Sequence, residues 1–448
     1  MNKLVRRIKE SEKNLSVIKL GFIALLILLF LIPLGMIRGL INERQNTRYY
    51  AEQDIIERWG GEQVVGGPWI IVPYLAHSRD AEGNPVVHTR HACFLPDQLR
   101  IDGRARPEER RRGIYEVTLY SSELLVSGSF RRPSFADRRI NPADILWEDA
   151  VLAVEFPNMR GLADRVFLTW EGREIPFEAG QGQVGLFAGE IRAPLPDLEN
   201  APAGNLSFLF SLELQGGRSL SFLPLGEETR VSLTAPWPSP SFSGAFLPSS
   251  HSLKDASFEA YWYVLSLGRS YSQTWVSGEI DPQAIAASAF GVELMIPVDT
   301  YLKSQRSVKY GILFIFLPFL CFFLFEVSGS VRVHPLQYLL VGFANCLFYL
   351  LLLSIAEHLH FDWTYLLASL ATTALCTVYA RAVLRRRGLL MAPLLGAAYL
   401  FLYTVLRSED YALLIGSLGL FVILAAVMIG TRRIDWYNLG RSDTAPPA

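Results

Sequence analysis

The feature that most constrains this 448-residue chain is the placement of its long apolar stretches. The first, Leu20–Ile37, lies near the amino terminus and carries no charged residue. Because about 20 apolar helical residues cross the roughly 30 Å hydrocarbon core of a bilayer, each such stretch predicts a membrane-spanning helix. We therefore predict a multi-pass α-helical membrane protein with six transmembrane helices, the first over residues 20–41. The other five are expected at about residues 308–327, 336–355, 363–384, 389–406 and 411–430.

The first apolar stretch is predicted to be an uncleaved signal anchor. A cleaved signal peptide would have a shorter apolar region, followed by a small-residue cleavage site that this sequence lacks. Residues 1–19 form a basic tail before the anchor, and basic segments that flank a first helix stay on the cytoplasmic side. We therefore expect this tail in the cytoplasm.

Charge is distributed unevenly along the chain. The formal net charge is −1, from 42 basic and 43 acidic residues. Residues 42–307 carry 25 basic and 34 acidic residues, whereas the two flanks together carry 17 basic and 9 acidic residues. An acidic central domain argues against nucleic-acid binding, because it offers no basic excess to displace counterions from phosphates.

The short loops between the apolar stretches predict the orientation of the chain. With a cytoplasmic amino terminus, the basic loops fall on the cytoplasmic side, namely those with Arg332, with Arg381 and Arg385–Arg387, and with Arg432 and Arg433. The loops at residues 357–362 and 407–410, which are acidic or mixed, fall on the opposite side. This pattern follows the positive-inside rule and places both termini, including the tail 431–448, in the cytoplasm. The domain 42–307 is then expected in the periplasm, and the helices in the inner membrane of a bacterial cell.

The central domain is predicted to be β-rich. Residues 43–59 contain no Gly or Pro and should continue the anchor as a helix that ends at Gly60-Gly61. Several later runs alternate apolar and polar residues, including Tyr115–Tyr120, and Pro-rich segments separate them. The run Leu206–Leu214 is followed by Gly216-Gly217 and Leu220–Leu223, which predicts a hairpin. A β-sandwich or open barrel fits this pattern.

The motifs that could carry chemistry are weak. Residues 180–185 match G-x-G-x-x-G, but a proline at 194 leaves no room for the helix that a nucleotide site requires. His88 and His91 are three residues apart, so on a strand they face opposite ways, and no Cys or carboxylate set joins them and His77 as metal ligands. We therefore predict no catalytic, cofactor-binding or metal-binding residue and no cofactor.

Ionisable residues in or beside the membrane helices are the candidate functional residues. Such groups are costly at membrane depth, and for that reason they are functional candidates by default. Glu326 lies near one end of the second span, where an ordinary boundary carboxylate is the competing interpretation. The others lie on loops opposite the basic ones and would form an acidic mouth if the helices pack together. They are Glu357, His358, Glu409 and Asp410.

Many short runs along nearly the whole chain resemble the CreD family of bacterial inner-membrane proteins, which are described as cell envelope integrity proteins. The resemblance implies a role in envelope homeostasis under control of a two-component stress system, and it brings no catalytic residue or substrate. The matching runs are Glu43-Arg44-Gln45 with Arg48, Gly67-Pro68, Pro73-Tyr74, Trp237 with Pro240–Pro248, Pro297-Val298-Asp299 with Tyr301, Val308-Lys309-Tyr310, Phe325-Glu326, His334–Tyr338, Leu350–Ser354, Glu357-His358, Ser408–Leu414 and Thr431–Tyr437.

The expected function is therefore non-enzymatic support of envelope integrity and of the envelope stress response. The expected partners are the lipid bilayer and envelope proteins or lipids that the exported domain contacts. A second hypothesis is a transporter, channel or lipid-handling protein that uses the acidic residues and histidines of the second to sixth spans. A third, a membrane-tethered enzyme, has no motif to support it.

Overall fold

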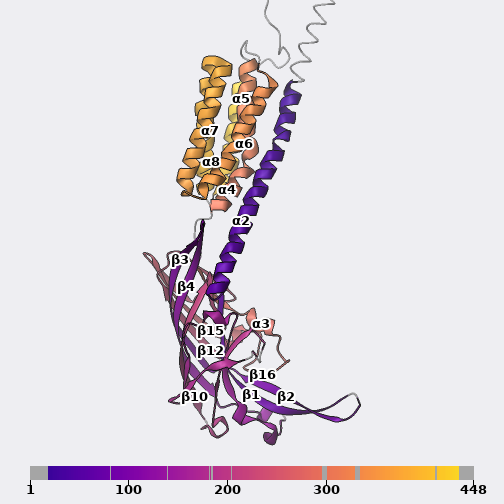
Figure 1. The fold of residues 1–448 in the computed structure, drawn as a ribbon, viewed down its shortest axis with the longest axis vertical. Coiled ribbons are helices and arrows are strands. Elements are labelled where there is room, and N and C mark those ends of the chain that lie inside the picture. The colour runs from indigo at the N-terminus through magenta and orange to yellow at the C-terminus, as the bar shows by residue number, and fades with distance from the viewer. Residues whose placement is uncertain are drawn as a thin grey trace, which may run out of the picture. The chain divides into compact units, whose positions relative to one another are not determined.

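The computed structural model describes residues 19–80, 82–138, 140–180, 182, 185–202, 204–294, 300–327, 333–408 and 411–432. The chain forms two compact units, one helical and one β-rich, whose elements are labelled in Figure 1. The helical unit comprises Met1–Thr47 and Val298–Ala448, and the β-rich unit comprises Arg48–Pro297. These limits differ from the expected 42–307 at both ends, because residues 42–47 continue the first helix within the helical unit and residues 300–307 belong to the helix Thr300–Lys309 of that unit.

The first membrane helix is long and extends from Lys19 to Trp59. Its longer part is α2 (Leu31–Trp59), and the one-residue break before it, at Phe30, lies three residues ahead of Pro33. A proline has no N–H to donate, so the carbonyl of Leu29 loses its helical partner there. At the other end, Gly60 has φ 136° and the Gly61 N–H donates to the Ile56 carbonyl at 2.7 Å. The predicted helix end at Gly60-Gly61 is confirmed.

The remaining helices of this unit follow residue 300. They are α4 (Thr300–Lys309), α5 (Gly311–Val327), α6 (Pro335–Ala356), α7 (Phe361–Leu384), α8 (Met391–Arg407) and α9 (Ala412–Thr431). By length and apolar composition, the described residues contain four candidate membrane spans, or five if the bent pair α4–α5 counts as one. The β-rich domain lies between the first and second of these spans. The predicted count of six is not confirmed.

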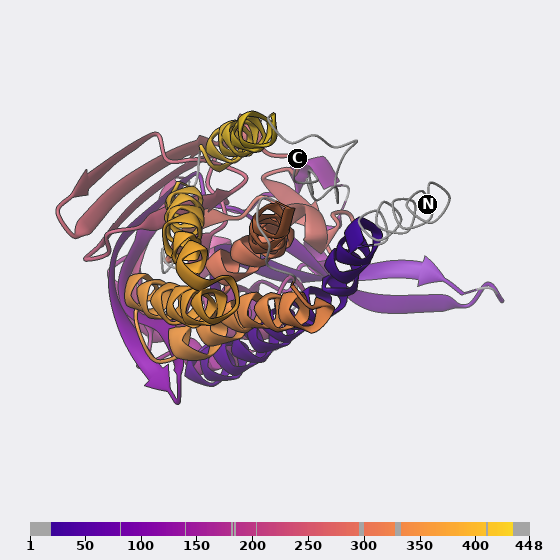
Figure 2. The ribbon, with the colours of Figure 1, turned by 90° about the horizontal axis from the view of Figure 1, so that it is seen from above.

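The count depends on the segment Phe361–Arg407, which is long and apolar enough to be taken as one helix of 47 residues. Within it, the 3-10 turn η7 (Arg385–Leu390) separates α7 from α8. The Tyr365 hydroxyl donates to the Tyr399 carbonyl at 2.7 Å, and the Tyr403 hydroxyl donates to Asp362 at 3.1 Å. These contacts pair the start of α7 with the end of α8, so the two helices form an antiparallel hairpin, visible as neighbours in Figures 1 and 2.

Aromatic rings and glycines pack the core of the helical unit. A Cβ on Gly342 of α6 would lie 2.3 Å from the Phe30 ring, and a Cβ on Gly311 would lie 2.8 Å from Leu34. Small residues let membrane helices approach closely, because dispersion contacts hold them together in lipid. The ring of Phe348 lies 4.5 Å from that of Tyr399, centroid to centroid, in the middle of this core.

The β-rich unit contains two sheets that share one hydrophobic core among the described residues. The nine-stranded sheet comprises β13 (Pro240–Gly244), β17 (Phe290–Leu294), β11 (Ser219–Phe222), β1 (Gln63–Arg79), β5 (Val151–Phe156), β9 (Gly189–Pro194) and β8 (Glu178–Gly180) in spatial order. Off this path, β2 (Pro85–Phe94) pairs with β1, and β16 (Thr274–Val276) pairs with β2. The eight-stranded sheet comprises β14 (Ser250–Lys254), β15 (Ser257–Leu265), β12 (Glu228–Ala235), β3 (Gln98–Arg112), β4 (Tyr115–Arg131), β10 (Asn205–Gly217), β6 (Phe167–Trp170) and β7 (Arg173–Pro176). The predicted β-rich domain is therefore confirmed.

The predicted hairpin across Gly216-Gly217 is wrong. β10 lies in the eight-stranded sheet and β11 in the nine-stranded sheet, so the chain changes sheets at this corner. Arg218 has φ 63° at the turn. The two glycines are needed for close packing: a Cβ on Gly216 would lie 2.5 Å from the Tyr120 hydroxyl, and one on Gly217 would lie 2.8 Å from Ile56.

Candidate functional site

One candidate residue, Glu326, lies at the end of α5 in an ion pair. The Lys19 ammonium donates to one carboxylate oxygen of Glu326, and the Tyr338 hydroxyl of α6 donates to the other at 3.4 Å. Lys19 also reaches the Val333 carbonyl at 3.5 Å. The Glu326 side chain is only 13% exposed, so this cluster joins the start of the first helix to α5 and α6 at a largely buried point.

A second candidate, Glu357, caps the end of α6 and joins three helices. The Tyr301 hydroxyl of α4 donates to a Glu357 carboxylate oxygen at 3.3 Å, and the Arg44 Nε lies 3.9 Å from the same oxygen. Beside them, the Gln305 amide donates to the Asn42 side chain at 2.8 Å. Polar side chains thus fasten α2 to α4 and α6 at this end of the unit.

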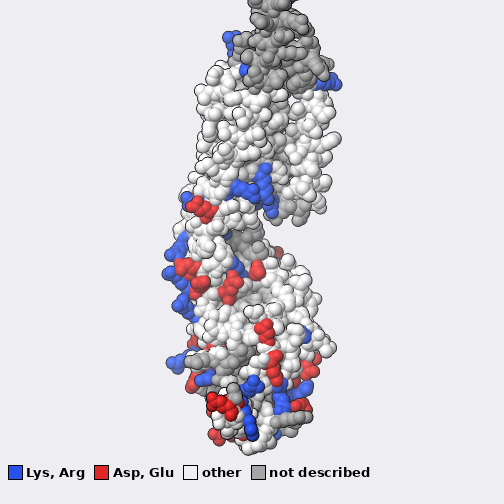
Figure 3. All heavy atoms as spheres, turned by 90° about the vertical axis from the view of Figure 1, so that its right-hand side faces the viewer, with Lys and Arg blue, Asp and Glu red and all other residues white. Residues whose placement is uncertain are grey.

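The two clusters lie at opposite ends of α6. Tyr338 and Glu357 are 19 residues apart in the sequence, which corresponds to about 28 Å along a helix at 1.5 Å per residue. That length is close to the thickness of a hydrocarbon core. On the face of the helical unit seen in Figure 3, charged side chains gather at the two ends and the surface between them is uncharged. The clusters therefore have the positions of membrane-boundary contacts.

The remaining candidate residues are His358, Glu409 and Asp410, and the expected acidic mouth stays a prediction because only the first of them is described. The His358 side chain is exposed, and the structure records no partner for it within the described residues. His360 lies 3.8 Å from Asp362, which also accepts the hydrogen bond from Tyr403. Glu409 and Asp410 lie outside the described residues.

The partners of the two glutamates are the residues of these clusters that sequence reasoning missed. Lys19 and Arg44 lie 307 and 313 residues before the carboxylates that they contact, so spacing gave no indication of either pair. The one available signal was that Lys19 immediately precedes the uncharged stretch and that Arg44 belongs to a run shared with a known family.

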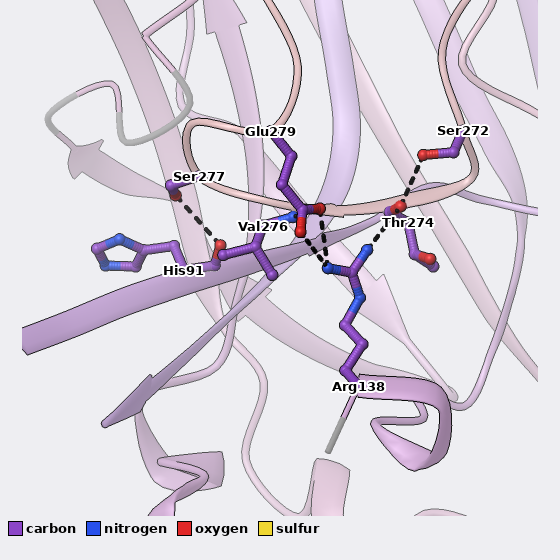
Figure 4. A network of polar contacts seen from close by, with 7 residues as sticks. All are labelled: His91, Arg138, Ser272, Thr274, Val276, Ser277 and Glu279. Carbon is purple, nitrogen blue, oxygen red and sulfur yellow. Dashed lines mark hydrogen bonds and ion pairs between the residues drawn. The ribbon is translucent and has the colours of Figure 1, made fainter. Parts of the chain in front are cut away.

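In the β-rich unit, a polar network ties the turn η1 (Ala136–Arg138) to β16, as Figure 4 shows. Arg138 donates to both carboxylate oxygens of Glu279, at 2.8 and 3.0 Å, and to the Thr274 carbonyl at 3.0 Å. The guanidinium holds the pKa of Glu279 below its usual value, so this contact is stabilising above the usual pKa and is lost as pH falls. The Ser277 hydroxyl also donates to the His91 carbonyl of β2 at 3.1 Å, so the network fastens η1, β2 and β16 to one another.

The histidines considered above as metal ligands are dispersed. His77 lies 3.1 Å from Asp144, whereas the pKa of His91 on β2 is lowered by burial. No group of three His, Cys, Asp or Glu side chains suited to a metal ion occurs in the part of the chain that the structure describes.

The glycine motif at residues 180–185 is followed by β9 instead of the helix that a phosphate site requires. Buried Glu155 accepts the backbone N–H groups of Leu186 and Phe187 at 3.0 and 2.9 Å and so holds the segment beyond the motif against the sheet.

The chain is similar to known proteins over most of its length. A family model described as inner membrane protein CreD matches residues 16–437. A curated relative, inner membrane protein CreD of Escherichia coli (strain K12), is 33% identical over 418 residues, which cover 92% of this chain and 91% of that protein. The match includes both the membrane helices and the β-rich domain. The chain therefore belongs to the CreD family of inner membrane proteins.

Proposed function

We propose that this protein supports the integrity of the cell envelope through protein contacts made by its β-rich domain, which it holds on the periplasmic side of the inner membrane. Six spans place both termini in the cytoplasm. In this topology α4 and α5 form one bent span, and α7 and α8 form two separate spans joined by the basic turn η7. The contact between Tyr365 and Tyr399, which pairs α7 with α8 in antiparallel fashion, supports this topology. The arginines of η7 also support it, because basic loops stay on the cytoplasmic side.

The observation that carries the functional proposal is an apolar surface on the outer face of the eight-stranded sheet. Leu125 on β4, Leu209 on β10 and Phe167 on β6 are 46%, 40% and 44% exposed, although each belongs to a regular strand. On β15 of the same sheet, Tyr261 and Tyr263 also point outward. We call these five residues the outer-face patch. Exposed apolar residues gathered on one face of a sheet mark interaction sites.

The strand register places four of the five patch residues in two neighbouring rows, where polar side chains separate the tyrosines from the leucines. One row crosses the sheet as Tyr261, Ser232, Asp102, Leu125 and Ser211. The next row crosses as Tyr263, Arg230, Arg100, Ser127 and Leu209.

The polar members of these rows also favour a protein partner. Arg230 lies over the Tyr263 ring at 5.4 Å, and Arg100 pairs with Asp102 at 2.7 Å. Tyr, Phe and Arg are enriched in protein interfaces. The surface therefore fits an envelope protein better than a lipid surface, which would favour a basic patch without carboxylates.

Photo-crosslinking in living cells tests this proposal. A photoreactive phenylalanine analogue placed at Leu209 or Tyr263 of the full-length protein should capture a discrete envelope protein. The same analogue at Val87, which is 50% exposed on β2, should not capture it. In parallel, Leu209→Asp combined with Tyr263→Asp should sensitise cells to detergent, and Val87→Asp should not. Equal crosslinking from both surfaces, or full resistance of the double variant, would contradict the proposal.

The transport hypothesis is less well supported. Glu326 and Glu357 face cationic or hydroxyl partners at the two ends of the helical unit, which is the arrangement expected of side chains that fasten helices. A transport pathway would instead need ionisable groups near the middle of the membrane.

A double-mutant cycle separates these two roles of Glu326. Lys19→Met and Glu326→Gln should each lower the unfolding temperature of the purified protein, because each leaves one charge of the pair without its partner. The double variant should lose less free energy of unfolding than the two single variants added together, and the difference should be about 1–3 kcal/mol. Exchange of the two residues, Lys19→Glu with Glu326→Lys, should preserve envelope resistance. Additive losses, or a loss of resistance in the exchanged but stable variant, would favour a transport role.

A further inference from the structure

The helical unit contains an apolar groove that neither glutamate cluster uses. It lies between α5, α8 and α9 and has a volume of about 610 Å³. Apolar side chains and backbone line it throughout, for example Leu320 and Leu324 of α5, Leu394 of α8, and Ala426 of α9. A groove of this composition in a membrane helix bundle suits a hydrocarbon chain and excludes a polar solute.

The groove runs along α9, which packs loosely against the rest of the unit. Within α9, whose 20 residues are all described, Gly416 alone is buried, and a Cβ there would lie 3.3 Å from the Tyr310 hydroxyl. One turn further, a Cβ on Gly419 would overlap the Phe401 ring at 2.1 Å. These glycines bring the first half of α9 close to its neighbours. Beyond them, Val422 and Ala426 face the groove.

Basic side chains lie at the end of the groove that the second half of α9 reaches. Gly430 lines the groove, and Arg432, two residues later, is exposed. The antiparallel helix α8 begins at the same end, directly after η7, whose Arg385 and Arg386 are also exposed. The described acidic residue at this end is Glu326, whose charge Lys19 balances. The groove thus combines an apolar interior with a cationic rim.

We propose that this groove binds one acyl chain of an anionic glycerophospholipid, with the phosphate held by Arg432 and the arginines of η7. Charge complementarity favours this occupant, since a zwitterionic lipid would gain less from a rim of arginines. A second copy of the chain is the competing occupant, because α9 is apolar on all sides. The arginine rim argues against it, since a symmetric contact through α9 would bring like charges together. The inference adds a binding site to the proposed function and does not depend on the outer-face patch.

Native mass spectrometry of the full-length protein in detergent tests the proposal, with dioleoyl phosphatidylglycerol and dioleoyl phosphatidylethanolamine as the added probes. We expect phosphatidylglycerol to remain bound at activation energies that strip phosphatidylethanolamine. Arg432→Gln and Arg386→Gln should each weaken phosphatidylglycerol retention by about fivefold, the effect of one basic residue near an anionic lipid. Arg407→Gln, at the opposite end of α8, should have no effect.

A second pair of variants tests the apolar part of the groove. Ala426→Trp fills the groove and should abolish retention, whereas Leu424→Trp, at an exposed position outside it, should not. The same spectra report the mass of the assembly. Equal retention of both lipids, insensitivity to Ala426→Trp, or a lipid-free dimer that Ala426→Trp dissociates would each overturn the proposal.

Discussion

Replacement of Trp262 by alanine is expected to lower the free energy of unfolding of the β-rich domain by about 3–5 kcal/mol. Trp262 lies on β15 and is fully buried. Its ring packs at 5.8 Å from both Phe242 on β13 and Phe290 on β17, so it is a contact between the two sheets. Alanine would leave a cavity between the sheets. For a domain of this size, the unfolding temperature should fall by roughly 10 °C.

Two matched variants show whether lost packing is the cause. Trp262→Phe keeps an aromatic ring, and the indole N–H has no hydrogen-bond partner within the described residues. Trp262→Phe should therefore lower the free energy of unfolding by less than about 1.5 kcal/mol. The neighbouring Tyr261 faces outward, so Tyr261→Ala should cost about 0.5 kcal/mol or less. Thermal unfolding of the full-length protein, followed by near-ultraviolet circular dichroism, measures all three. Equal losses for Trp262→Phe and Trp262→Ala would show that packing between the sheets is not the cause.

Replacement of Gly60 by alanine is expected to cost about 2–5 kcal/mol, because two penalties combine there. Gly60 has φ 136°, a conformation that side chains disfavour, and it ends the helix that enters the β-rich domain. A Cβ would also lie 2.3 Å from the Gln215 carbonyl oxygen and 2.8 Å from the Gly161 Cα. Both atoms are backbone, so neither can move aside as a flexible side chain could.

The control for Gly60 is a glycine with only one of the two penalties. Gly278 has φ 89°, and no atom lies within 4 Å of a Cβ built there. Gly278→Ala should therefore cost about 1–2 kcal/mol, the conformational penalty alone. Limited proteolysis of the β-rich domain over a range of temperatures would rank the two variants by the temperature at which half of the domain is cleaved. If they ranked equally, the close approach to Gln215 and Gly161 would not matter for stability.

Much of the local structure could be predicted from residue patterns. The alternation in residues 206–214 matches the alternating burial of β10, and Gly60-Gly61 marks the end of the first helix. The hairpin after β10 could not be predicted, because the glycines at 216 and 217 serve packing against Tyr120 and Ile56. A glycine required for a turn and a glycine required for close approach have the same appearance in a sequence.

The candidate site likewise has residues that could be predicted from the sequence and contacts that could not. Glu326 and Glu357 stand out because ionisable groups are rare beside apolar stretches, and no tertiary information is needed to select them. Their partners, Lys19 and Arg44, come from the first helix, more than 300 residues earlier in the chain. Pairing over that separation depends on which helix faces are adjacent, and periodicity cannot specify that.

Apolar length, charge placement and strand alternation are local properties, and each corresponds directly to a solvent or a secondary structure. For this reason the membrane helices, the inserted β-rich domain and the family resemblance are readable from the chain. The two-sheet crossover at Arg218, the ion pairs at both ends of the helical unit and the apolar groove beside α9 depend on contacts between distant segments. Such contacts are selected by shape and charge complementarity after the helices and strands have assembled, so they are visible in the tertiary structure alone.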